Sequence, residues 1–404
     1  MPKIKVAFFT HYTSLYGANR SLLNLIDGLK SYDIVPFVIV PSEGDITNAL
    51  KTRNVEFAII PIQWWVGKRK FESNYFSNVY ETAKHFRRAF KRLYKNLKVL
   101  PSLINQLREW NIDLVYTNAS VIPEGALVSR RLKLPHIWHL REFIDLDYDF
   151  HHDWGKAVFN YFVSQADAQI AISKAIHSYF TKGISPTRMH LVYNGIASTE
   201  EFDRLYKQES PSTSDDKPYT FALVGVIHPN KGQETAIRAF NVLFDTHSKI
   251  RLLIVGNGET AHLKKLAQEL GISNQVEFWG HIDNPYKAYL AADAVLMCSK
   301  NEGMGRVTVE AMSARRPVIG YDNAGTSEII KHEYTGLLYK GEHEALAMCM
   351  KRFIENPNWA KKLGDNAWHI ARKEYSIETY SKKIYEIIVS VVKTKNIVSK
   401  FNKS

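Results

Sequence analysis

Two glutamates, Glu302 and Glu310, flank a glycine-containing turn in the segment Glu302-Gly-Met-Gly-Arg-Val-Thr-Val-Glu310. The apolar run at 294–298 comes just before them and predicts a buried parallel strand, and residues from Val307 onward can begin a helix. Glu302 is then expected in the strand-to-helix loop, at the edge of the sheet where open α/β folds bind ligands. Glu310 is expected about one to two turns into the helix.

This arrangement suits a sugar nucleotide. Carboxylates accept hydrogen bonds from hydroxyl groups, so the two glutamates could hold a sugar and a ribose. Gly303 and Gly305 would let the backbone approach a ligand closely, and the first N–H groups of the helix would face its phosphates. The residues alone leave an alternative open, namely two solvated glutamates beside a common kind of turn.

The chain has 404 residues, which is more than one hydrophobic core usually supports, so two domains are expected. No apolar run reaches the length of a membrane-spanning helix, and the first residues enter a strand without a signal-peptide pattern. We therefore expect a cytoplasmic protein. Cys298 and Cys349 have no metal-ligand spacing and are expected to be reduced core residues.

The net charge of +12 indicates an anionic partner. Between residues 84 and 98 there are seven basic side chains and no acidic one, and apolar residues recur there at helical spacing. Such a basic amphipathic helix can bind an anionic membrane surface, with Arg87, Arg88, Lys91 and Arg92 as contacts. The alternative is a helix that packs its apolar side on its own domain.

Short apolar runs alternate with helical stretches in both halves of the chain, which predicts parallel sheets covered on both faces. A polar stretch from 200 to 218, rich in proline and serine toward its end, is the expected linker. A last helix near 377–392 could pack across both domains, and the tail after it is expected to be frayed. The expected strands are 4–9, 35–40, 55–60, 114–117, 136–139, 168–172 and 190–193, then 220–224, 251–255, 276–279, 294–298, 318–321 and 336–339.

Several motifs occur in the order found in the family 4 glycosyltransferases of the GT-B fold, which the chain resembles over nearly its whole length. The two glutamates match the family's signature of glutamates separated by seven residues. The resemblance implies two Rossmann-like domains that face a central cleft: residues 1–205 on the acceptor side and 206–376 on the nucleotide-sugar side, with a crossover helix and basic tail at 377–404. Further matching stretches are 192–196, 223–225 with 231–232, 253–258, 317–320, 325–328 and 335–338.

The resemblance also implies roles for single residues. Glu302 would bind hydroxyls of the donor sugar and Glu310 those of the ribose, while Lys231 and the backbone amides after Glu302 would hold the diphosphate. His139 would bind the transferred sugar and support its developing charge, so His139, Glu302 and Lys231 are the expected catalytic residues, with no protein nucleophile. The expected donor-binding residues are Gly17, Gly225, Lys231, Gly256, Ile282, Glu302, Gly303, Met304, Gly305, Arg306 and Glu310.

Three further features of the sequence raise questions of their own. An arginine that the family often has after the glycine of the first strand of the second domain is replaced by Val226, and Arg306 is a candidate replacement because its guanidinium suits phosphate. Tyr16 replaces a common glycine of the N-terminal loop, so the shape of that loop is open. Arg141 and Glu142 could form a simple surface ion pair.

Two further patterns compete with this interpretation. The segment 256–261 fits a dinucleotide-binding fingerprint, but it follows the second strand of its domain and not the first. Asp145, Asp147, Asp149, His151, His152 and Asp153 offer metal ligands, but a solvated acidic loop is the preferred interpretation, acceptor recognition comes next and a metal site comes last. Similarity to GT-B enzymes of this kind implies no metal and no cofactor.

The resulting hypothesis is a retaining transferase that moves a hexose or deoxyhexose from a nucleotide sugar, with UDP or dTDP as the carrier, to a hydroxyl acceptor. The basic helix suggests a lipid-linked glycan acceptor, as in cell-surface polysaccharide assembly at the inner face of the plasma membrane. An epimerase or phosphorylase of the same fold is an alternative, and so is a basic nucleic-acid-binding protein. No nucleic-acid partner is expected, because recognition motifs for nucleic acid are not evident.

Overall fold

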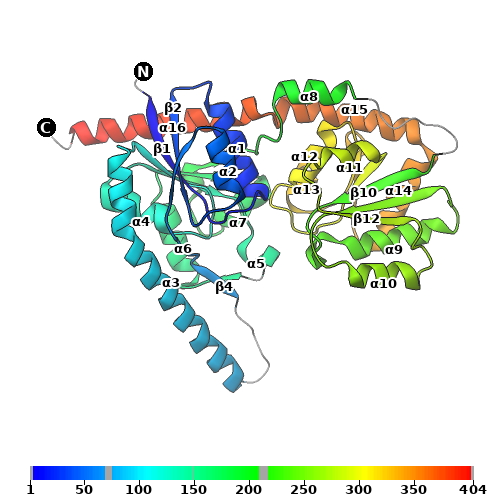
Figure 1. The fold of residues 1–404 in the computed structure, drawn as a ribbon, viewed down its shortest axis with the longest axis horizontal. Coiled ribbons are helices and arrows are strands. Elements are labelled where there is room, and N and C mark those ends of the chain that lie inside the picture. The colour runs from blue at the N-terminus through cyan, green and yellow to red at the C-terminus, as the bar shows by residue number, and fades with distance from the viewer. Residues whose placement is uncertain (1–2, 69–74, 149, 209–216, 402–404) are drawn as a thin grey trace. The chain divides into compact units, whose positions relative to one another are not determined.

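The computed structural model describes residues 3–68, 75–148, 150–208 and 217–401. The chain forms two compact units, one made of Met1–Gly195 with Ile377–Ser404 and the other of Ile196–Ser376. Each unit contains its own parallel sheet with helices around it (Figure 1). Among the described residues, no helix is both long enough and apolar enough to cross a bilayer.

The main sheet of the first unit has seven parallel strands in the order β3-β2-β1-β5-β6-β8-β9. The order reverses between β1 and β5, so the loops that follow these two strands lead in opposite directions, which is the usual place for a ligand in an open α/β sheet. The strands match those expected from the sequence within one or two residues: β1 (Ile4–Phe9), β2 (Ile34–Val40), β3 (Glu56–Ile59), β5 (Leu114–Thr117), β6 (His136–Leu140), β8 (Ala168–Ala171) and β9 (Met189–Leu191).

Helices cover both faces of this sheet. The C-terminal helix α16 buries Tyr380, Ile384 and Ile388 in the same core as Leu22 and Ile26 of α1, so it is part of the first unit (Figure 1). It extends to Phe401, so the expected frayed tail is helical over most of its length, and the Lys395 ammonium lies 3.4 Å from an Asp167 carboxylate oxygen. The helices are α1 (Gly17–Leu29), α2 (Asp45–Thr52), α3 (Tyr75–Glu109), α4 (Glu124–Leu132), α5 (Ile144–Tyr148), α6 (Gly155–Ser164), α7 (Lys174–Thr181), η1 (Pro186–Arg188) and α16 (Ile377–Phe401).

A small antiparallel pair of strands, β4 (Val66–Lys68) and β7 (Phe150–His152), was not expected from the sequence. Each strand has only three residues, and one contains Gly67 while the other contains two histidines, so neither shows a recognisable alternation of apolar and polar residues.

The sheet of the second unit has six parallel strands in the order β12-β11-β10-β13-β14-β15, which reverses between β10 and β13. The large side chains of Phe221, Phe240 and Phe353 fill its core. Its strands are β10 (Tyr219–Val224), β11 (Ile250–Val255), β12 (Val276–Gly280), β13 (Ala294–Met297), β14 (Val318–Tyr321) and β15 (Gly336–Tyr339), as expected. Its helices are α8 (Thr199–Tyr206), η2 (Pro229–Lys231), α9 (Gln233–Phe244), α10 (Ala261–Glu269), α11 (Tyr286–Ala291), α12 (Arg306–Ser313), α13 (Ala324–Ile329), α14 (His343–Glu355) and α15 (Pro357–Glu374).

The first part of the expected linker is helix α8, and residues 209–216 of that linker lie outside the described residues. The Ser198 hydroxyl caps this helix by accepting a hydrogen bond from the Glu201 N–H at 3.1 Å. The Trp368 indole of α15 donates to the Phe202 carbonyl at 3.0 Å, and Arg372 pairs with Asp203 at 2.7 and 2.8 Å. These contacts attach α8 to the second unit, so the division falls after Gly195 and not after residue 205.

Candidate active site

Lys231 and Glu302 meet at the point where the strand order of the second unit reverses. Lys231 ends η2 in the loop after β10, and Glu302 lies in the loop between β13 and α12. The Lys231 ammonium donates a short hydrogen bond to the Glu302 carboxylate, and both side chains are partly exposed. The structure therefore brings together two expected site residues that are 71 positions apart in the sequence, at the usual ligand position of an open α/β sheet.

The turn after Glu302 is held in place by the beginning of α13. Gly325 N donates to the Glu302 carbonyl at 2.8 Å, and a Cβ at Gly325 would lie 2.6 Å from the Cα of Met304. Gly305 adopts a left-handed backbone conformation with φ of 80°, and α12 begins directly after it. The first amides of α12 therefore lie immediately after the turn, as the sequence predicts for a phosphate-binding helix end.

Two hydroxyl groups lie beside this turn. A Cβ at Gly305 would be 3.3 Å from the Thr308 hydroxyl and 3.5 Å from the Thr326 hydroxyl. Both hydroxyls are buried and have no hydrogen-bond partner within the part of the chain that the structure describes. Buried hydroxyls of this kind are usually completed by an ordered water or by a polar ligand.

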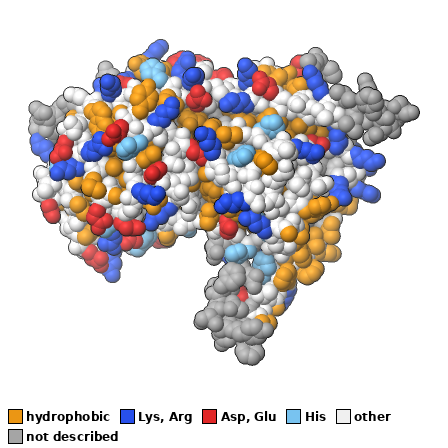
Figure 2. Space-filling model, turned by 180° about the vertical axis from the view of Figure 1, so that it is seen from behind, with side chains coloured by type: hydrophobic (Ala, Val, Ile, Leu, Met, Phe, Trp, Pro, Cys, Tyr) orange, Lys and Arg blue, Asp and Glu red, His pale blue; other side chains and the backbone are white. Residues whose placement is uncertain are grey.

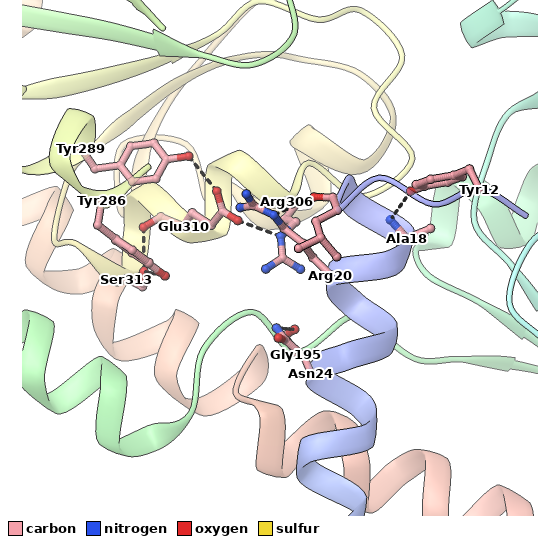
Figure 3. Close-up of polar contacts among 11 residues, drawn as sticks. Tyr12, Ala18, Arg20, Asn24, Gly195, Tyr286, Tyr289, Arg306, Glu310 and Ser313 are labelled. Atoms are coloured by element: carbon pink, nitrogen blue, oxygen red, sulfur yellow. Dashed lines mark hydrogen bonds and ion pairs between the residues drawn. The ribbon is translucent and has the colours of Figure 1, made fainter. Parts of the chain in front are cut away.

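Glu310 is almost fully buried and has two fixed partners. One carboxylate oxygen accepts a hydrogen bond from the Tyr289 hydroxyl at 2.8 Å, and the other accepts from Arg306 Nε at 2.7 Å (Figure 3). Burial and the charge of Glu310 raise the pKa of Tyr289 well above its ordinary value, so this phenol remains a donor. A carboxylate has about four acceptor positions, so Glu310 keeps the capacity to accept from two further hydroxyls.

The Arg306 side chain is bound to another residue of the site, which is not expected of a simple phosphate ligand. Its Nε is bound to Glu310 four residues later, and its side chain is largely buried. The structure thus gives Arg306 a role in orienting Glu310, and its proposed replacement of the family arginine missing at Val226 stays a prediction. Val226 itself is exposed, and its carbonyl accepts from the Gln233 side chain at 2.9 Å.

The remaining expected donor residues lie at the carboxyl ends of three neighbouring strands. Gly225 and Gly256 follow β10 and β11, and a Cβ at Gly256 would lie 1.8 Å from the Gly225 carbonyl, so the two loops touch through their backbones. Ile282 follows β12 and packs against the small apolar cluster that includes Ala288 and Ala292. The structure therefore places these three residues on the same edge as Glu302, and their contacts with a nucleotide stay predictions.

In the first unit, Gly17 begins α1 in the loop after β1. Asn19 fixes this loop, because its side-chain amide donates to the Tyr12 and Ser14 carbonyls at 2.9 and 2.8 Å. Tyr16 has an ordinary negative φ of −81° and a half-exposed side chain, so no glycine is required at that position. A Cβ at Gly17 would meet no atom within 4 Å, which leaves open space beside it.

His139 lies in β6 and is completely buried. Its Nδ1 is 2.7 Å from the Tyr116 hydroxyl and 3.1 Å from Arg141 Nη2. Burial, together with the positive charge of Arg141, holds the pKa of His139 well below its ordinary value, so the ring is neutral near pH 7. His139 therefore does not carry the positive charge that general acid catalysis by an imidazolium would require.

Arg141 and Glu142 do not form the simple surface pair considered from the sequence. Arg141 is buried and donates to Asn118, while the Glu142 carboxylate accepts from the Ser120 N–H at 3.1 Å. Burial raises the pKa of Glu142. The local sequence shows two adjacent opposite charges, but in the loop directly after β6 each of them has a different buried partner.

The basic helix predicted around residues 84–98 is α3. Arg87, Arg88 and Lys91 are exposed, as membrane contact would require. The prediction that Arg92 contacts the membrane is wrong. Its side chain points inward and forms a bidentate pair with the buried Asp153, with Arg92 Nε 2.8 Å from a carboxylate oxygen. The Asp153 carboxylate is therefore occupied by this ion pair.

The acidic stretch before Asp153 is also structural in part. Asp145 accepts a hydrogen bond from the Tyr179 hydroxyl at 2.6 Å. Asp149 and the side chain of Asp147 lie outside the described part of the structure. Over the described ranges, no three His, Cys, Asp or Glu side chains are placed to hold a metal ion.

Several functional residues were not identified from the sequence. Tyr289 contacts Glu310, Tyr116 and Arg141 contact His139, and Asn118 holds Arg141, and only contact in the fold reveals these roles. Among the residues that shape the site and were not predicted, only Gly325 could have been found from the sequence, because it lies in the stretch 325–328 that matches a family motif.

Comparison with known proteins agrees with this architecture. A family model described as glycosyl transferases group 1 matches residues 206–369, and one described as glycosyltransferase family 4 matches residues 16–200. An uncharacterized glycosyltransferase of Methanocaldococcus jannaschii is 29% identical over 219 residues, which are 51% of this chain and 55% of that protein. A second one from the same organism is 25% identical over 358 residues, 84% of this chain and 93% of that protein. The first alignment thus spans about half of the relative's length.

Solved structures show the same fold. The crystal structure of Anabaena HepE in complex with UDP and glucose has a TM-score of 0.75 and 22% identity, and the match covers 96% of this chain and 100% of that one. The strand order, the position of the paired glutamates and the two family matches lead to one conclusion. The chain belongs to the family 4 glycosyltransferases and has the GT-B fold.

Proposed function

We propose that this protein transfers a sugar from a nucleoside diphosphate to a hydroxyl group of an acceptor. The observation that carries the proposal is the pairing of Lys231 with Glu302 at the strand-order reversal of the second unit, beside the start of α12. HepE was crystallised with UDP, with UDP and glucose, and with UDP-glucose, which supports a UDP sugar as the first donor to test. A dTDP sugar is the second.

The reaction requires stabilisation of a departing diphosphate and of a sugar that develops positive charge. Lys231 and the first amides of α12 would offset the negative charge of the diphosphate without a metal ion. Glu302 would accept hydrogen bonds from sugar hydroxyls, and Glu310, held by Tyr289 and Arg306, would accept those of the ribose. No step requires a protein nucleophile, so we propose front-face substitution with retention of configuration.

Product analysis tests this proposal. With UDP-glucose and a hydroxyl acceptor, we expect a glycoside whose anomeric configuration matches that of the donor. The Glu302→Gln variant should lose about 100-fold in turnover, because the carboxylate is replaced by a neutral amide. Glu269→Gln, which changes an exposed glutamate of α10, is the control and should retain full activity.

Other products would contradict specific parts of the proposal. An inverted glycoside would contradict retention. Nucleotide release without a glycoside would indicate an epimerase or hydrolase, and dependence on inorganic phosphate would indicate a phosphorylase.

The surface of α3 supports a membrane-bound acceptor. Phe86, Phe90, Tyr94 and Leu97 form a helical stripe that is 44%, 59%, 67% and 51% exposed. Figure 2 shows hydrophobic side chains gathered over this helix. Apolar side chains of this size are normally buried, so an exposed row of them indicates a binding surface.

The opposite side of α3 is fastened to the first unit by polar contacts. Besides the Arg92–Asp153 pair, Asn96 exchanges two hydrogen bonds with the backbone of Gln63, at 2.9 and 3.0 Å. The sequence alternative, in which the apolar side packs on its own domain, holds in part, because the rings of Phe86 and Phe90 lie 6.5 and 4.9 Å from the ring of Trp154, yet the stripe remains largely exposed. The apolar stripe faces solvent because polar residues dock the helix.

A basic row accompanies the apolar stripe. Arg87, Lys91, Lys95 and Lys98 each directly follow a stripe residue and are exposed, so they lie about 100° around the helix from it. Apolar side chains with an adjacent row of cations match the acyl boundary and the anionic headgroups of a lipid surface. We propose that α3 binds anionic membrane and that the acceptor is a lipid-linked glycan.

Vesicle binding measures this directly. At low salt the protein should bind vesicles that contain phosphatidylglycerol and not purely zwitterionic ones. Replacing Arg87 and Lys91 with serine should weaken binding about 30-fold, because each basic residue contributes about 1 kcal/mol near such a surface. Phe90→Ser with Tyr94→Ser should also weaken it.

The charge-matched control replaces Lys361 and Lys362, which are exposed on α15, with serine. Equal losses in the α3 and α15 variants would show a nonspecific charge effect and contradict the assignment to α3. Absence of binding at low salt would contradict the membrane proposal itself.

A further inference from the structure

The His139 ring has two nitrogens in different situations. Nδ1 faces the Tyr116 hydroxyl at 2.7 Å and Arg141 Nη2 at 3.1 Å. Nε2 is buried and has no hydrogen-bond partner within the described part of the chain. One side of the ring is therefore fully engaged, and the other carries a buried nitrogen whose hydrogen-bonding capacity is not used by the described residues.

The partner of Nδ1 determines where the proton is. A guanidinium group has only donors, so Nδ1 must accept from Arg141 and cannot carry a hydrogen itself. The ring is neutral because burial and the charge of Arg141 hold the pKa of His139 well below its ordinary value. The single proton of the ring is then on Nε2, which makes this nitrogen a donor.

A buried N–H group without an acceptor destabilises the protein. That cost is removed when an oxygen atom of a ligand reaches Nε2. The ring is thus prepared to donate a hydrogen bond, and it cannot accept a proton there as a general base would.

Arg141 is held in one orientation by residues from three segments. Its Nε donates to the Asn118 side chain at 3.0 Å, Nη1 to the Asn194 side chain at 2.7 Å, and Nη2 also to the Tyr380 hydroxyl at 3.1 Å. Asn118 follows β5. Asn194 lies just before the chain leaves the first unit, and Tyr380 lies just after it returns. Both chain crossings therefore help to orient the group that faces His139.

We propose that Arg141 is a positioning residue that keeps His139 in its neutral Nε2–H form, so that His139 donates a hydrogen bond to an oxygen of a bound sugar substrate. The identity of this ligand rests on the proposed function. The protonated nitrogen and its dependence on Arg141 are properties of the protein alone.

Nitrogen-15 NMR of the histidine rings in the full-length protein tests the assignment. The His139 signal can be identified among those of the 15 histidines by its loss in His139→Gln. We expect an Nε2-protonated ring that does not titrate between pH 5 and 8. Tyr116→Phe, which retains Arg141, should leave this form unchanged, whereas Arg141→Gln should give an Nδ1-protonated or titrating ring.

Activity supplies the second measurement. Arg141→Gln should lower kcat about 10-fold or more and introduce an ionisation near neutral pH in the rate profile, while the KM for the nucleotide sugar changes little. If Arg141→Gln does not fold, Arg141→Lys, which keeps a donor, replaces it and should retain the Nε2–H form.

The outcomes separate the two proposals. An Nδ1-protonated His139 in the unmodified protein would overturn the positioning role of Arg141 whatever the activity, and so would an Nε2–H ring in Arg141→Gln with an unchanged rate profile. The expected tautomer in a protein that transfers no sugar would instead count against the proposed function.

Discussion

The two signature glutamates are held in different ways. Glu302 is partly exposed and pairs with the flexible ammonium of Lys231. Glu310 is nearly buried between the rigid ring of Tyr289 and the guanidinium of Arg306 (Figure 3). Glu302 can therefore exchange its partner for a substrate hydroxyl with little reorganisation, whereas Glu310 offers a fixed acceptor.

Glu124 is a buried carboxyl group away from these glutamates. It is the first residue of α4, has no exposed surface, and accepts a hydrogen bond from the Gln63 N–H at 3.3 Å. Burial raises its pKa from 4.5 to about 8. Because the folded protein holds this proton more tightly than the unfolded chain, stability is greatest below the unfolded pKa and falls as the pH rises from 4.5 to about 8.

Glu124→Gln should remove this dependence. Urea unfolding of the variant and the unmodified protein should give similar stabilities at pH 5, and the variant should be more stable by a few kcal/mol at pH 9. Glu43→Gln, at an exposed position of the same unit, should have no such effect. A stability difference that is the same at both pH values would contradict the buried, protonated state of Glu124.

At the scale of single residues, the sequence identifies residues that belong to a motif. It misses residues whose role depends on contact with a distant part of the chain. Glu302, Glu310 and Lys231 could be predicted from spacing and order. Tyr289 could not, because it approaches Glu310 from another helix. Arg92 was assigned to the outer surface because its partner Asp153 is 61 residues away, beyond the reach of helical periodicity.

At the scale of elements, strands with continuous apolar runs were predictable, because burial on both faces leaves an unmistakable composition. The three-residue strands β4 and β7 were not, since their pairing depends on each other and on no local pattern. Helix α8 was taken for linker because it adjoins a polar stretch, although Ser198 and Glu201 form a helix-start pattern.

The signature turn depends on the close approach of α13. Gly325→Ala would place a Cβ 2.6 Å from the Met304 Cα and 2.7 Å from the Gly303 carbonyl, so the turn must shift. We expect a loss of about 1–3 kcal/mol in stability and at least a 10-fold loss of UDP affinity by calorimetry.

Gly364→Ala provides a matched control, because its Cβ would lie 2.2 Å from the Arg315 carbonyl, in α15 and away from the turn. This variant should lose stability and keep its affinity for UDP. Equal affinity in the two variants would show that α13 does not determine the shape of the turn.

At the scale of the whole molecule, the six strands of the second sheet follow the same order as the first six strands of the seven-stranded sheet, with one reversal in each, and each unit carries expected site residues at the carboxyl edge of its sheet. Two domains and their fold could be predicted from two alternating series of strands and helices. The division after Gly195 could not, because it depends on the packing of α8 against Trp368 and Arg372.

The central claim is that the second unit binds a nucleoside diphosphate through the glutamate pair. Thermal unfolding in the presence of EDTA, with UDP, dTDP, GDP, ADP and NAD in turn, tests it most directly. A ligand at about 100 times its Kd adds about 2.7 kcal/mol, enough for a shift of several degrees. We predict a shift with UDP or dTDP that disappears in Glu310→Ala and persists in Glu269→Ala. No shift with any nucleoside diphosphate, a shift with NAD alone, or an equal shift in Glu310→Ala would contradict the account.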